Sequence, residues 1–273
     1  YEDADELIDY APEEEKELYN LMILLKRRKE WRRANGAIEI EEPVGRINFN
    51  NNQFKLKVIE PSESRLVVSE SMILMNTVIA EYGRNHKIAF PYRSQPKSAI
   101  NSDTITKNNN IIVANNIIKS KLHKSVTTAT PYPHFSLGLS SYVHATSPIR
   151  RYTDFFTHIQ LTSHLEGREL ISESSTEEII KYVEHKTREI SLIIKEDRSH
   201  WLKLFMDNNE KDLWSIKILR IINQSNKLYL SYFNDLYMSI IVRIERGDSL
   251  QMGDDTLIRY CKLETINEFL TFD

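Results

Sequence analysis

The hydrophobic period of the chain changes at Leu213, and this change constrains the fold more than any other feature of the sequence. From there to the C-terminal end apolar and polar residues alternate, which is typical of half-buried strands. We expect five short strands, at residues 214–219, 228–232, 239–244, 256–260 and 268–272, with a turn at Met252–Asp254. Five strands in about 60 residues predict a small closed β-barrel of the OB type. This domain would cover residues 212–273, after a polar linker at Asn208–Asp212.

The preceding residues have a mainly helical pattern. Only 7 glycines and 8 prolines among 273 residues favour few tight turns. We expect helices at residues 1–10, 12–35, 63–83, 111–124, 148–166 and 175–207, a small antiparallel meander at 37–60, an extended segment at 88–93 and a polar loop at 94–110. The expected fold class is therefore α+β, with residues 1–208 as one domain and the barrel as the second.

Charges and capping residues predict the ends of two of these helices. The helix at 12–35 follows the helix dipole, with glutamates at 13–15, basic residues at 26–33 and Gly36 as its C-terminal cap. Its basic end is either a solvated face or one wall of a nucleic-acid path. A capping box at Ser175–Glu178 predicts the start of the last helix. The expected buried stripe of that helix is Ile179, Ile180, Val183, Ile190, Ile193, Ile194, Trp201, Leu202 and Phe205, and its charged run at 195–198 should face solvent.

The helix expected from Pro148 breaks the usual charge rule. A hydroxyl at Thr146 or Ser147 would cap it, and proline suits its first position. Arg150 and Arg151 would then lie in the first turn, where the dipole disfavours cations by about 0.3–1 kcal/mol each. Two guanidinium groups beside open helix N–H groups predict an anion site, most simply for a phosphate. The alternative is that both arginines reach solvent or pair with distant acids.

Other residues of these helices allow two interpretations each. The apolar residues Ile149, Tyr152, Phe155, Phe156 and Ile159 recur at helical spacing and are expected to face the core. His158 is expected to be a hydrogen-bonded structural histidine rather than a catalyst. Glu70 lies among apolar helix positions, as either a solvent-facing side chain or an acid that points into a cleft. Barrel aromatics could stack on RNA bases or belong to the core; they are Trp214, Tyr229, Tyr232, Phe233 and Tyr237.

Composition restricts the class of protein and its compartment. A net charge of −3 provides no global basic field, so any nucleic-acid binding needs a local channel. The single cysteine, Cys261, excludes an internal disulfide and a cysteine-based zinc site, and it fits a reducing, cytosol-like compartment. No apolar run reaches the roughly 18–20 residues of a membrane span. The chain begins at Tyr1 without a methionine or a signal peptide, which indicates a fragment or a processed chain.

Residues 134–158 resemble the RNB family of exoribonucleases, the ribonuclease II and ribonuclease R type. The resemblance is carried by the pattern His134-Phe135-x-Leu137-x-Leu139-x-x-Tyr142-x-His144-x-Thr146-Ser147-Pro148-Ile149-Arg150-Arg151-Tyr152-x-Asp154, followed by His158. Ile159 departs from the family, which usually has arginine there. Residues 1–8, 36–38 and 69–76 resemble other parts of the family's catalytic domain, and the terminal barrel would correspond to its OB-fold RNA-binding domain.

This resemblance implies an enzyme that digests single-stranded RNA from the 3′ end with magnesium and releases nucleoside monophosphates. Arg150 matches the arginine that stabilises charge on the scissile phosphate. Tyr1 matches a tyrosine that stacks near the terminal nucleotide, and Glu70 a glutamate at the terminal ribose. The family also has a glutamate on the long helix before the tryptophan that matches Trp201. The register places Lys195 at that position, with Glu196 one position further on. The remaining expected RNA contacts are Tyr142, His144, Thr146, Ser147, Arg151 and Glu196.

The family's metal-binding aspartate segment has no counterpart in the sequence, because Glu2, Asp3, Asp5 and Glu6 have the wrong spacing. The first hypothesis is therefore the downstream part of a 3′→5′ exoribonuclease that carries the phosphate clamp and no metal ligands. The second is a non-catalytic RNA-binding or scaffolding relative. The third is an unrelated helical protein that binds a phosphorylated small molecule. We expect a monomer that makes no membrane contact and lies in the cytoplasm, with an organelle as the other candidate.

Overall fold

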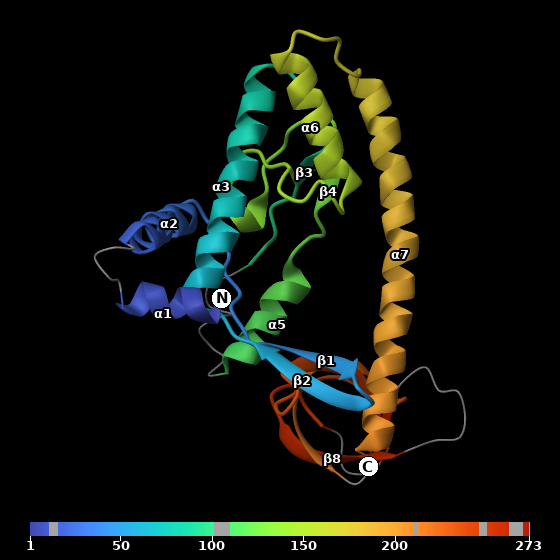
Figure 1. Cartoon of the computed structure of the whole chain (residues 1–273). Coiled ribbons are helices and arrows are strands. Elements are labelled where there is room, and N and C mark those ends of the chain that lie inside the picture. Colours follow the sequence, from blue (N-terminus) through green and yellow to red (C-terminus); the bar gives the residue numbers. More distant parts are fainter. Residues whose placement is uncertain (11–15, 101–109, 210–211, 246–249, 262–269, 273) are drawn as a thin grey trace. The chain divides into compact units, whose positions relative to one another are not determined.

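The structure is a computed structural model that describes residues 1–10, 16–100, 110–209, 212–245, 250–261 and 270–272 (Figure 1). Packing divides the chain into two compact units. The first unit comprises Tyr1–Ile40, Pro61–Ala99 and Lys121–Ile190, and the second comprises Glu41–Glu60, Ile100–Ser120 and Ser191–Asp273. A predicted division at residues 208–212 would assign the segments at 41–60 and 110–120 to the first domain, whereas the second unit contains both.

Helices form most of the first unit. They are α1 (Glu2–Tyr10), α2 (Lys16–Ala34), α3 (Glu63–Asn85), α6 (Tyr152–Leu165) and the first part of α7 (Glu173–Asn208). The predicted helices at 1–10, 12–35 and 63–83 are confirmed, although the predicted start of the second, at 12–15, lies outside the described residues. One apolar cluster joins α1, α2 and α3 through Ile8, Met22, Leu25 and Val67.

A short two-stranded sheet stands next to the second apolar cluster of this unit. Strands β3 (Tyr92–Ser94) and β4 (Val126–Thr128) pair antiparallel, and an isolated bridge joins Tyr92 to Val143. Tyr92 and Val143 are fully buried in a cluster with Ile79, Ala80, Ile88, Phe90 and Ala145. Because successive strand residues point to opposite faces, Arg93 lies on the face away from this cluster. The 3-10 turn Phe135–Leu137 ends at Gly138, whose φ of 65° is left-handed.

The second unit contains the predicted barrel. Its strands are β5 (Leu213–Asn223), β6 (Leu228–Phe233), β7 (Met238–Ile244), β8 (Asp255–Cys261) and β9 (Leu270–Phe272), closed in the order β5-β6-β7-β9-β8. The five predicted strands are thus confirmed, apart from positions 268–269, which lie outside the described residues. The barrel aromatics Trp214, Tyr229, Tyr232 and Phe233 are all buried, which favours the core interpretation for them.

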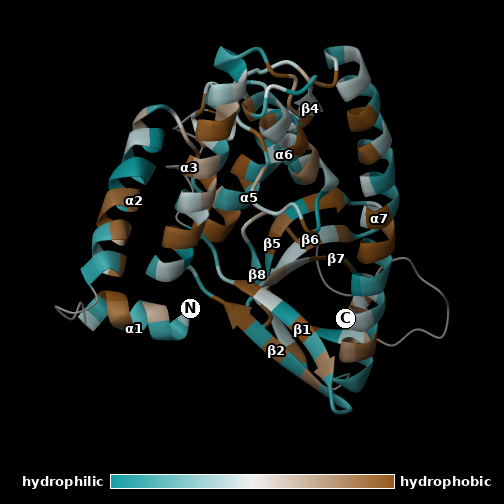
Figure 2. Cartoon of the chain, turned by 45° about the horizontal axis from the view of Figure 1, so that its top comes forward, coloured by the Kyte–Doolittle hydropathy of each residue, from teal (hydrophilic) through white to brown (hydrophobic). Residues whose placement is uncertain are grey.

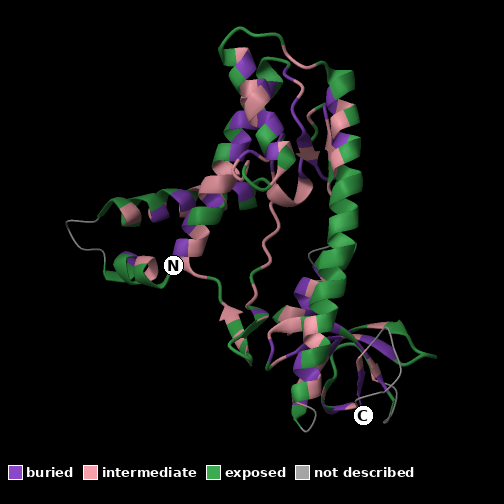
Figure 3. Ribbon diagram, turned by 45° about the vertical axis from the view of Figure 1, so that its right-hand side comes forward, coloured by how far each residue is buried: buried purple, intermediate pink, exposed green. Residues whose placement is uncertain are grey.

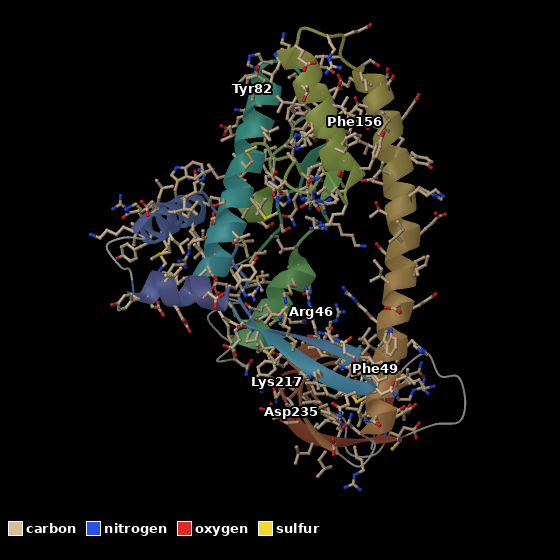
Figure 4. All side chains as sticks on the ribbon, in the orientation of Figure 1. Arg46, Phe49, Tyr82, Phe156, Lys217 and Asp235 are labelled. Atoms are coloured by element: carbon tan, nitrogen blue, oxygen red, sulfur yellow. The ribbon has the colours of Figure 1, made fainter. Side chains whose placement is uncertain are left out.

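A β-hairpin and a helix from earlier in the chain pack within the same unit. The hairpin, β1 (Val44–Asn50) and β2 (Gln53–Ile59), turns at Asn51 and Asn52, both with left-handed φ. The side chains of Ile47, Phe54 and Leu56 pack against the barrel core. Helix α5 (Ile111–Lys121) packs through Val113 against Leu219 and Tyr232. Figure 4 labels Arg46 and Phe49 on the hairpin and Lys217 and Asp235 on the barrel.

Helix α7 differs from its prediction in two respects. It begins at Glu173, and the Ser172 hydroxyl accepts a hydrogen bond from the N–H of Ser175, so Ser172 takes the capping role predicted for Ser175. Ile180 and Phe205 are buried as predicted, but Ile190, Ile193 and Ile194 are exposed. Hydrophobic residues therefore occur along α7 (Figure 2), while its middle is exposed (Figure 3). Residues 37–40, predicted as a strand, form none.

No helix in the described part of the chain is long and apolar enough to cross a bilayer.

Candidate functional site

The arginine segment forms a turn before the helix rather than the first turn of the helix. The carbonyl of Ser147 accepts hydrogen bonds from the N–H groups of Arg150 (3.3 Å) and Arg151 (3.1 Å). Arg151 then has extended backbone, with φ −126° and ψ 114°, and α6 begins only at Tyr152. The prediction that Pro148 opens the helix and that both arginines lie in its first turn is therefore wrong. The helix dipole gives no reason for the position of Arg150.

A buried carboxylate holds this turn in place. Asp154, in the first turn of α6, is 0% exposed, and its Oδ2 accepts hydrogen bonds from the Ser147 N–H (2.9 Å) and from Nη2 of Arg151 (2.8 Å). A carboxylate near a helix N-terminus is also favoured by the dipole. Two charge-assisted hydrogen bonds to one oxygen fix both ends of the turn. Arg151 is therefore the ion-pair partner of Asp154.

The tip of the turn is exposed. Ile149 is fully exposed, and Arg150 is also exposed. Within the described part of the chain, the Arg150 guanidinium has no hydrogen bond or ion pair with another side chain. The predicted core face of this helix is mostly wrong: Ile149, Tyr152 and Phe155 are exposed, and of the five predicted residues only Phe156, labelled in Figure 4, is fully buried. Exposed apolar side chains therefore lie next to Arg150 in the sequence, at the tip of the turn and the start of α6.

A hydrogen-bonded tyrosine lies beneath this turn. Nδ2 of Asn76, on α3, donates to the hydroxyl of Tyr142 (2.9 Å), and Oδ1 of Asn76 accepts from the N–H of Ala145 (2.9 Å). The Tyr142 ring contacts the rings of His134 and His144 edge-on, at centroid separations of 5.7 and 5.5 Å. Asn76 is 2% exposed, so both of its bonds are made away from water.

The two histidines of this cluster are neutral at physiological pH. Burial, together with the positive charge of Arg93, lowers the pKa of His134 to about 4. Burial also lowers the pKa of His144 to about 4, with Arg151 and Arg93 acting in the same direction. Burial raises the pKa of the Tyr142 hydroxyl, which stays protonated. Neutral imidazoles and a phenol can still donate hydrogen bonds to an anion.

Several buried polar atoms of the cluster have no hydrogen-bond partner among the described residues. They are Nδ1 of His134, Oγ1 of Thr146 and Nε of Arg151. An unsatisfied buried polar atom costs about 1–3 kcal/mol, so a native protein leaves few of them without a reason. Arg93 and Arg151 lie close enough to act on the histidines of the cluster, Arg150 belongs to the turn that follows, and among the described residues of the turn and the cluster Asp154 is the one buried carboxylate. The unsatisfied donors and excess positive charge both suit a negatively charged ligand.

Among the described residues, the other predicted site residues make none of the contacts of this cluster. Glu70 is 3% exposed, and both of its carboxylate oxygens bind the guanidinium of Arg32. This pair contradicts the solvent-facing alternative for Glu70. It also removes Arg32, which is 4% exposed, from the predicted solvated face, on which Arg27 and Arg33 are exposed. The Tyr1 ring is exposed, with the Arg65 guanidinium 4.1 Å from its centroid. Glu196 is exposed on the part of α7 that belongs to the second unit.

His158 is satisfied, as expected. Its Nε2 lies 2.7 Å from the carbonyl oxygen of Ala145, within hydrogen-bond distance. The hydroxyl of Thr157 donates to the carbonyl of His144 (3.2 Å) and to that of Thr153 (2.9 Å). Thr157 and His158 of α6 therefore hold the backbone of residues 144–145.

Arg93, Asn76 and Arg32 take part in these arrangements but were not predicted as site residues. A signal existed for Arg93, which ends the apolar run Ile88–Tyr92 and so places a cation beside a core strand. Asn76 is a polar residue one helical turn from the apolar residues Ile73 and Ile79 of α3. Arg32 could not be distinguished from its basic neighbours, because its carboxylate partner lies 38 positions away in the sequence.

The described residues do not fit a metal ion. Among them, no group of three or more histidine, cysteine, aspartate or glutamate side chains is placed to hold one. Asp154, the buried acid of the cluster, is already engaged by Ser147 and Arg151. No step of the chemistry is therefore assigned to a metal bound by these residues.

Comparison with known proteins gives consistent matches. The sequence pattern of the RNB domain matches residues 1–167. A ribonuclease of Synechocystis that is otherwise uncharacterized is 32% identical over 259 residues, which cover 92% of this chain and 39% of the relative. The chloroplastic/mitochondrial ribonuclease II of Arabidopsis thaliana is 30% identical and covers 100% of this chain and 35% of the relative. The chain thus spans well under half the length of these relatives.

Solved structures share the fold. The Dss1 exoribonuclease of Candida glabrata superposes with a TM-score of 0.84 at 18% identity, covering 99% of this chain and 37% of that protein. Mycoplasma genitalium RNase R in complex with ribose-methylated single-stranded RNA superposes with a TM-score of 0.76 at 18% identity, covering 94% of this chain and 49% of that protein. The mixed helical and sheet architecture with a closed five-stranded barrel is therefore that of these exoribonucleases.

Proposed function

The chain belongs to the RNB family, and on that premise we propose that it forms part of an exoribonuclease that hydrolyses single-stranded RNA in the 3′→5′ direction and releases nucleoside monophosphates. The observation that carries this proposal is the Arg150 turn, which holds an exposed and unpaired guanidinium in place through the buried Asp154. Relatives with ribonuclease names and a solved RNase R–RNA complex support the choice of RNA as the substrate.

Arg150 is the proposed catalytic residue. In the hydrolysis, water attacks the phosphorus of the last internucleotide bond, the bond to the 3′ oxygen breaks, and this oxygen takes up a proton. Negative charge develops on the phosphate oxygens during attack, and a guanidinium positioned across them stabilises it. The turn keeps Arg150 free of other anions, so it can fill this role without first breaking an ion pair.

Further contacts to RNA are proposed for the residues around the turn. Thr146 has a buried hydroxyl without a partner among the described residues, and the His144 ring contacts Tyr142. Ser147 and Arg151 fix the turn, and Tyr142 provides a hydroxyl and a ring. Tyr1 offers an exposed ring for stacking on a terminal base. Glu70 is proposed to contact the terminal ribose. Each of its oxygens keeps a second lone pair beside the Arg32 bond, which a 2′-OH could use.

The barrel is proposed to be of the OB type and to bind RNA. Its strand order, in which the fifth strand lies between the third and the fourth, and the parallel pairing of β7 with β9 support this assignment. Since the aromatics of β5 and β6 are buried, we propose that binding uses the barrel's surface charges and Glu196 of α7. Base stacking on the buried rings is not part of the proposal.

The family implies a divalent metal ion, and we propose magnesium. Since the described residues offer no group of ligands for it, we propose that an aspartate segment outside this sequence supplies them. We also propose a monomer in the cytoplasm or in an organelle. The organellar alternative draws on the Arabidopsis relative, whose name places it in chloroplasts and mitochondria.

The decisive experiment compares residues 1–273 with a version extended upstream in its reading frame. Each is assayed for magnesium-dependent shortening of single-stranded RNA labelled at its 5′ end, and for release of mononucleotides from the same RNA labelled along its length. The proposal expects activity in the extended chain only, and Arg150→Ala should lower its turnover by about 10²–10³-fold. Arg168→Ala is the matched control, because Arg168 is exposed and pairs with the exposed Glu166. RNA binding without degradation in both chains would favour a non-catalytic RNA-binding relative instead.

A further inference from the structure

Arg93 is a charged residue in a position where charge is costly. It is partly buried on β3, between two fully or nearly buried neighbours, Tyr92 and Ser94. Its guanidinium has no hydrogen bond or ion pair with any side chain in the described ranges. A partly buried and unpaired guanidinium loses hydration without a compensating partner. Such a side chain is explained most simply if its partner is a ligand.

The backbone determines which residues share a face with Arg93. Arg93 pairs with Thr127 of β4 on one side, and its N–H donates to the carbonyl of Tyr142 (2.8 Å) on the other. The antiparallel bridge between Tyr92 and Val143 sets Arg93 opposite Tyr142. Directly opposite residues of an antiparallel pair point to the same face. Arg93 therefore shares a face with Tyr142, whose ring contacts His134 and His144.

The charges around Arg93 do not neutralise it. Arg151 is close enough to repel it, and the carboxylate of Asp154 is already committed to Arg151. The attractive charge from α7 is Glu184, which is exposed and makes no ion pair with Arg93 within the described residues. The unpartnered Nδ1 of His134, which is 7% exposed, adds a second, independent sign of a missing ligand.

We propose that Arg93 binds a backbone phosphate of the RNA strand, a second phosphate beside the one assigned to Arg150. This inference rests on the proposed function and extends it. A guanidinium is suited to a phosphate because its planar fork matches two phosphate oxygens. The neutral imidazoles of His134 and His144 can donate additional hydrogen bonds without adding charge. Arg150 and Arg93 then each bind one phosphate, while Arg151 holds the turn in place.

The test measures the affinity of residues 1–273 for a fluorescently labelled single-stranded oligoadenylate over a series of salt concentrations. Arg93→Gln should weaken binding about tenfold and reduce the slope of log K against log salt by about 0.7, the value for one phosphate contact on a single strand. Arg93→Lys keeps the charge and should keep most of the slope at lower affinity. Arg168→Gln should bind like the unmodified chain.

An unchanged salt slope in a folded Arg93→Gln chain would overturn the assignment, as would a slope reduced equally by Arg168→Gln. If Arg93→Gln does not fold, the Arg93→Lys chain decides: unchanged affinity and slope would contradict a forked phosphate contact. Competition by adenosine monophosphate shows whether Arg93 binds a phosphate of the RNA backbone or the phosphate of a released mononucleotide. If Arg93→Gln weakened only that competition, the backbone assignment would be wrong. Absence of RNA binding by the unmodified chain would contradict the proposed function as well. If the unmodified chain bound RNA and substitution of Arg150, but not of Arg93, weakened the binding, only the assignment of Arg93 would be contradicted.

Discussion

Nη2 of Arg151 donates to Oδ2 of Asp154 at 2.8 Å, and the same oxygen accepts the N–H of Ser147. Two adjacent arginines therefore have different tasks. Arg151 closes the turn against α6, and Arg150 projects from it without a partner among the described side chains. The anion site predicted from helix-dipole arguments stays a prediction, and its residues form a turn tied to a buried acid rather than the first turn of a helix.

Removal of this acid should loosen the turn and destabilise the first unit. Asp154→Ala leaves the Arg151 guanidinium and the Ser147 N–H without their acceptor, and we expect the free energy of unfolding to fall by about 2–4 kcal/mol. Asp154→Asn should lose less, because an amide oxygen still accepts one bond. Urea unfolding of residues 1–273 measures both. Glu166→Ala, which breaks an exposed pair with Arg168, should change stability by less than about 0.5 kcal/mol; an equal loss in this control would refute the role of Asp154.

The buried Arg32–Glu70 pair allows a double-mutant cycle. Glu70→Leu alone leaves a guanidinium buried without its carboxylate and should cost about 3–5 kcal/mol. Arg32→Met alone should have a similar cost. The double variant should recover most of the loss, since two apolar side chains of similar volume need no partner. Denaturant unfolding gives the coupling energy, and additive losses would show that the pair is not an energetic unit.

Much of the fold follows from local sequence pattern. The barrel strands, the hairpin and helices α1 to α3 were predicted because hydrophobic period and turn residues act over a few positions. The site depended on longer-range contacts. The predicted start of α6 is wrong because the preference of proline for the first helical position is a local rule. The turn before α6 is held instead by the hydrogen bond from the Ser147 N–H to Asp154, seven residues further on. The burial of Arg32 could not be predicted because its partner Glu70 lies on another helix.

The exposed stripe of α7 shows a second limit. Ile190, Ile193 and Ile194 have helical spacing, which predicts a buried face, but they are exposed in this chain. Periodicity identifies the apolar face of a helix and leaves open what covers it. Arg93 and Asn76 were missed for the opposite reason, because their significance depends on which residues the fold places beside them.

Stability should decline in mild acid because of His134 and His144. The pKa of each is about 4 in the folded chain, below the ordinary value of 6.5. Between these values the unfolded chain binds protons that the folded chain does not bind, so the free energy of unfolding falls as pH decreases from about 6.5 to about 4. Urea unfolding at several pH values measures the slope. His134→Gln should make it shallower, whereas His185→Gln, at an exposed position on α7, should leave it unchanged; equal slopes in all three chains would contradict the assignment.

The close approach of Gly45 to Leu236 predicts how the hairpin joins the barrel within the second unit. The Gly45 N–H donates to the carbonyl of Tyr237 (2.9 Å), and a Cβ at this position would lie 1.7 Å from the carbonyl oxygen of Leu236. Backbone cannot yield as a flexible side chain can, so Gly45→Ala should displace β1 and lower the free energy of unfolding by about 1–3 kcal/mol or more. Val44→Ala, at an exposed neighbouring position, should cost less than about 0.5 kcal/mol. Hydrogen exchange should show faster exchange at β1 in the Gly45 variant; unchanged exchange and stability would mean that the hairpin tolerates the methyl group and that its contact with the barrel is loose.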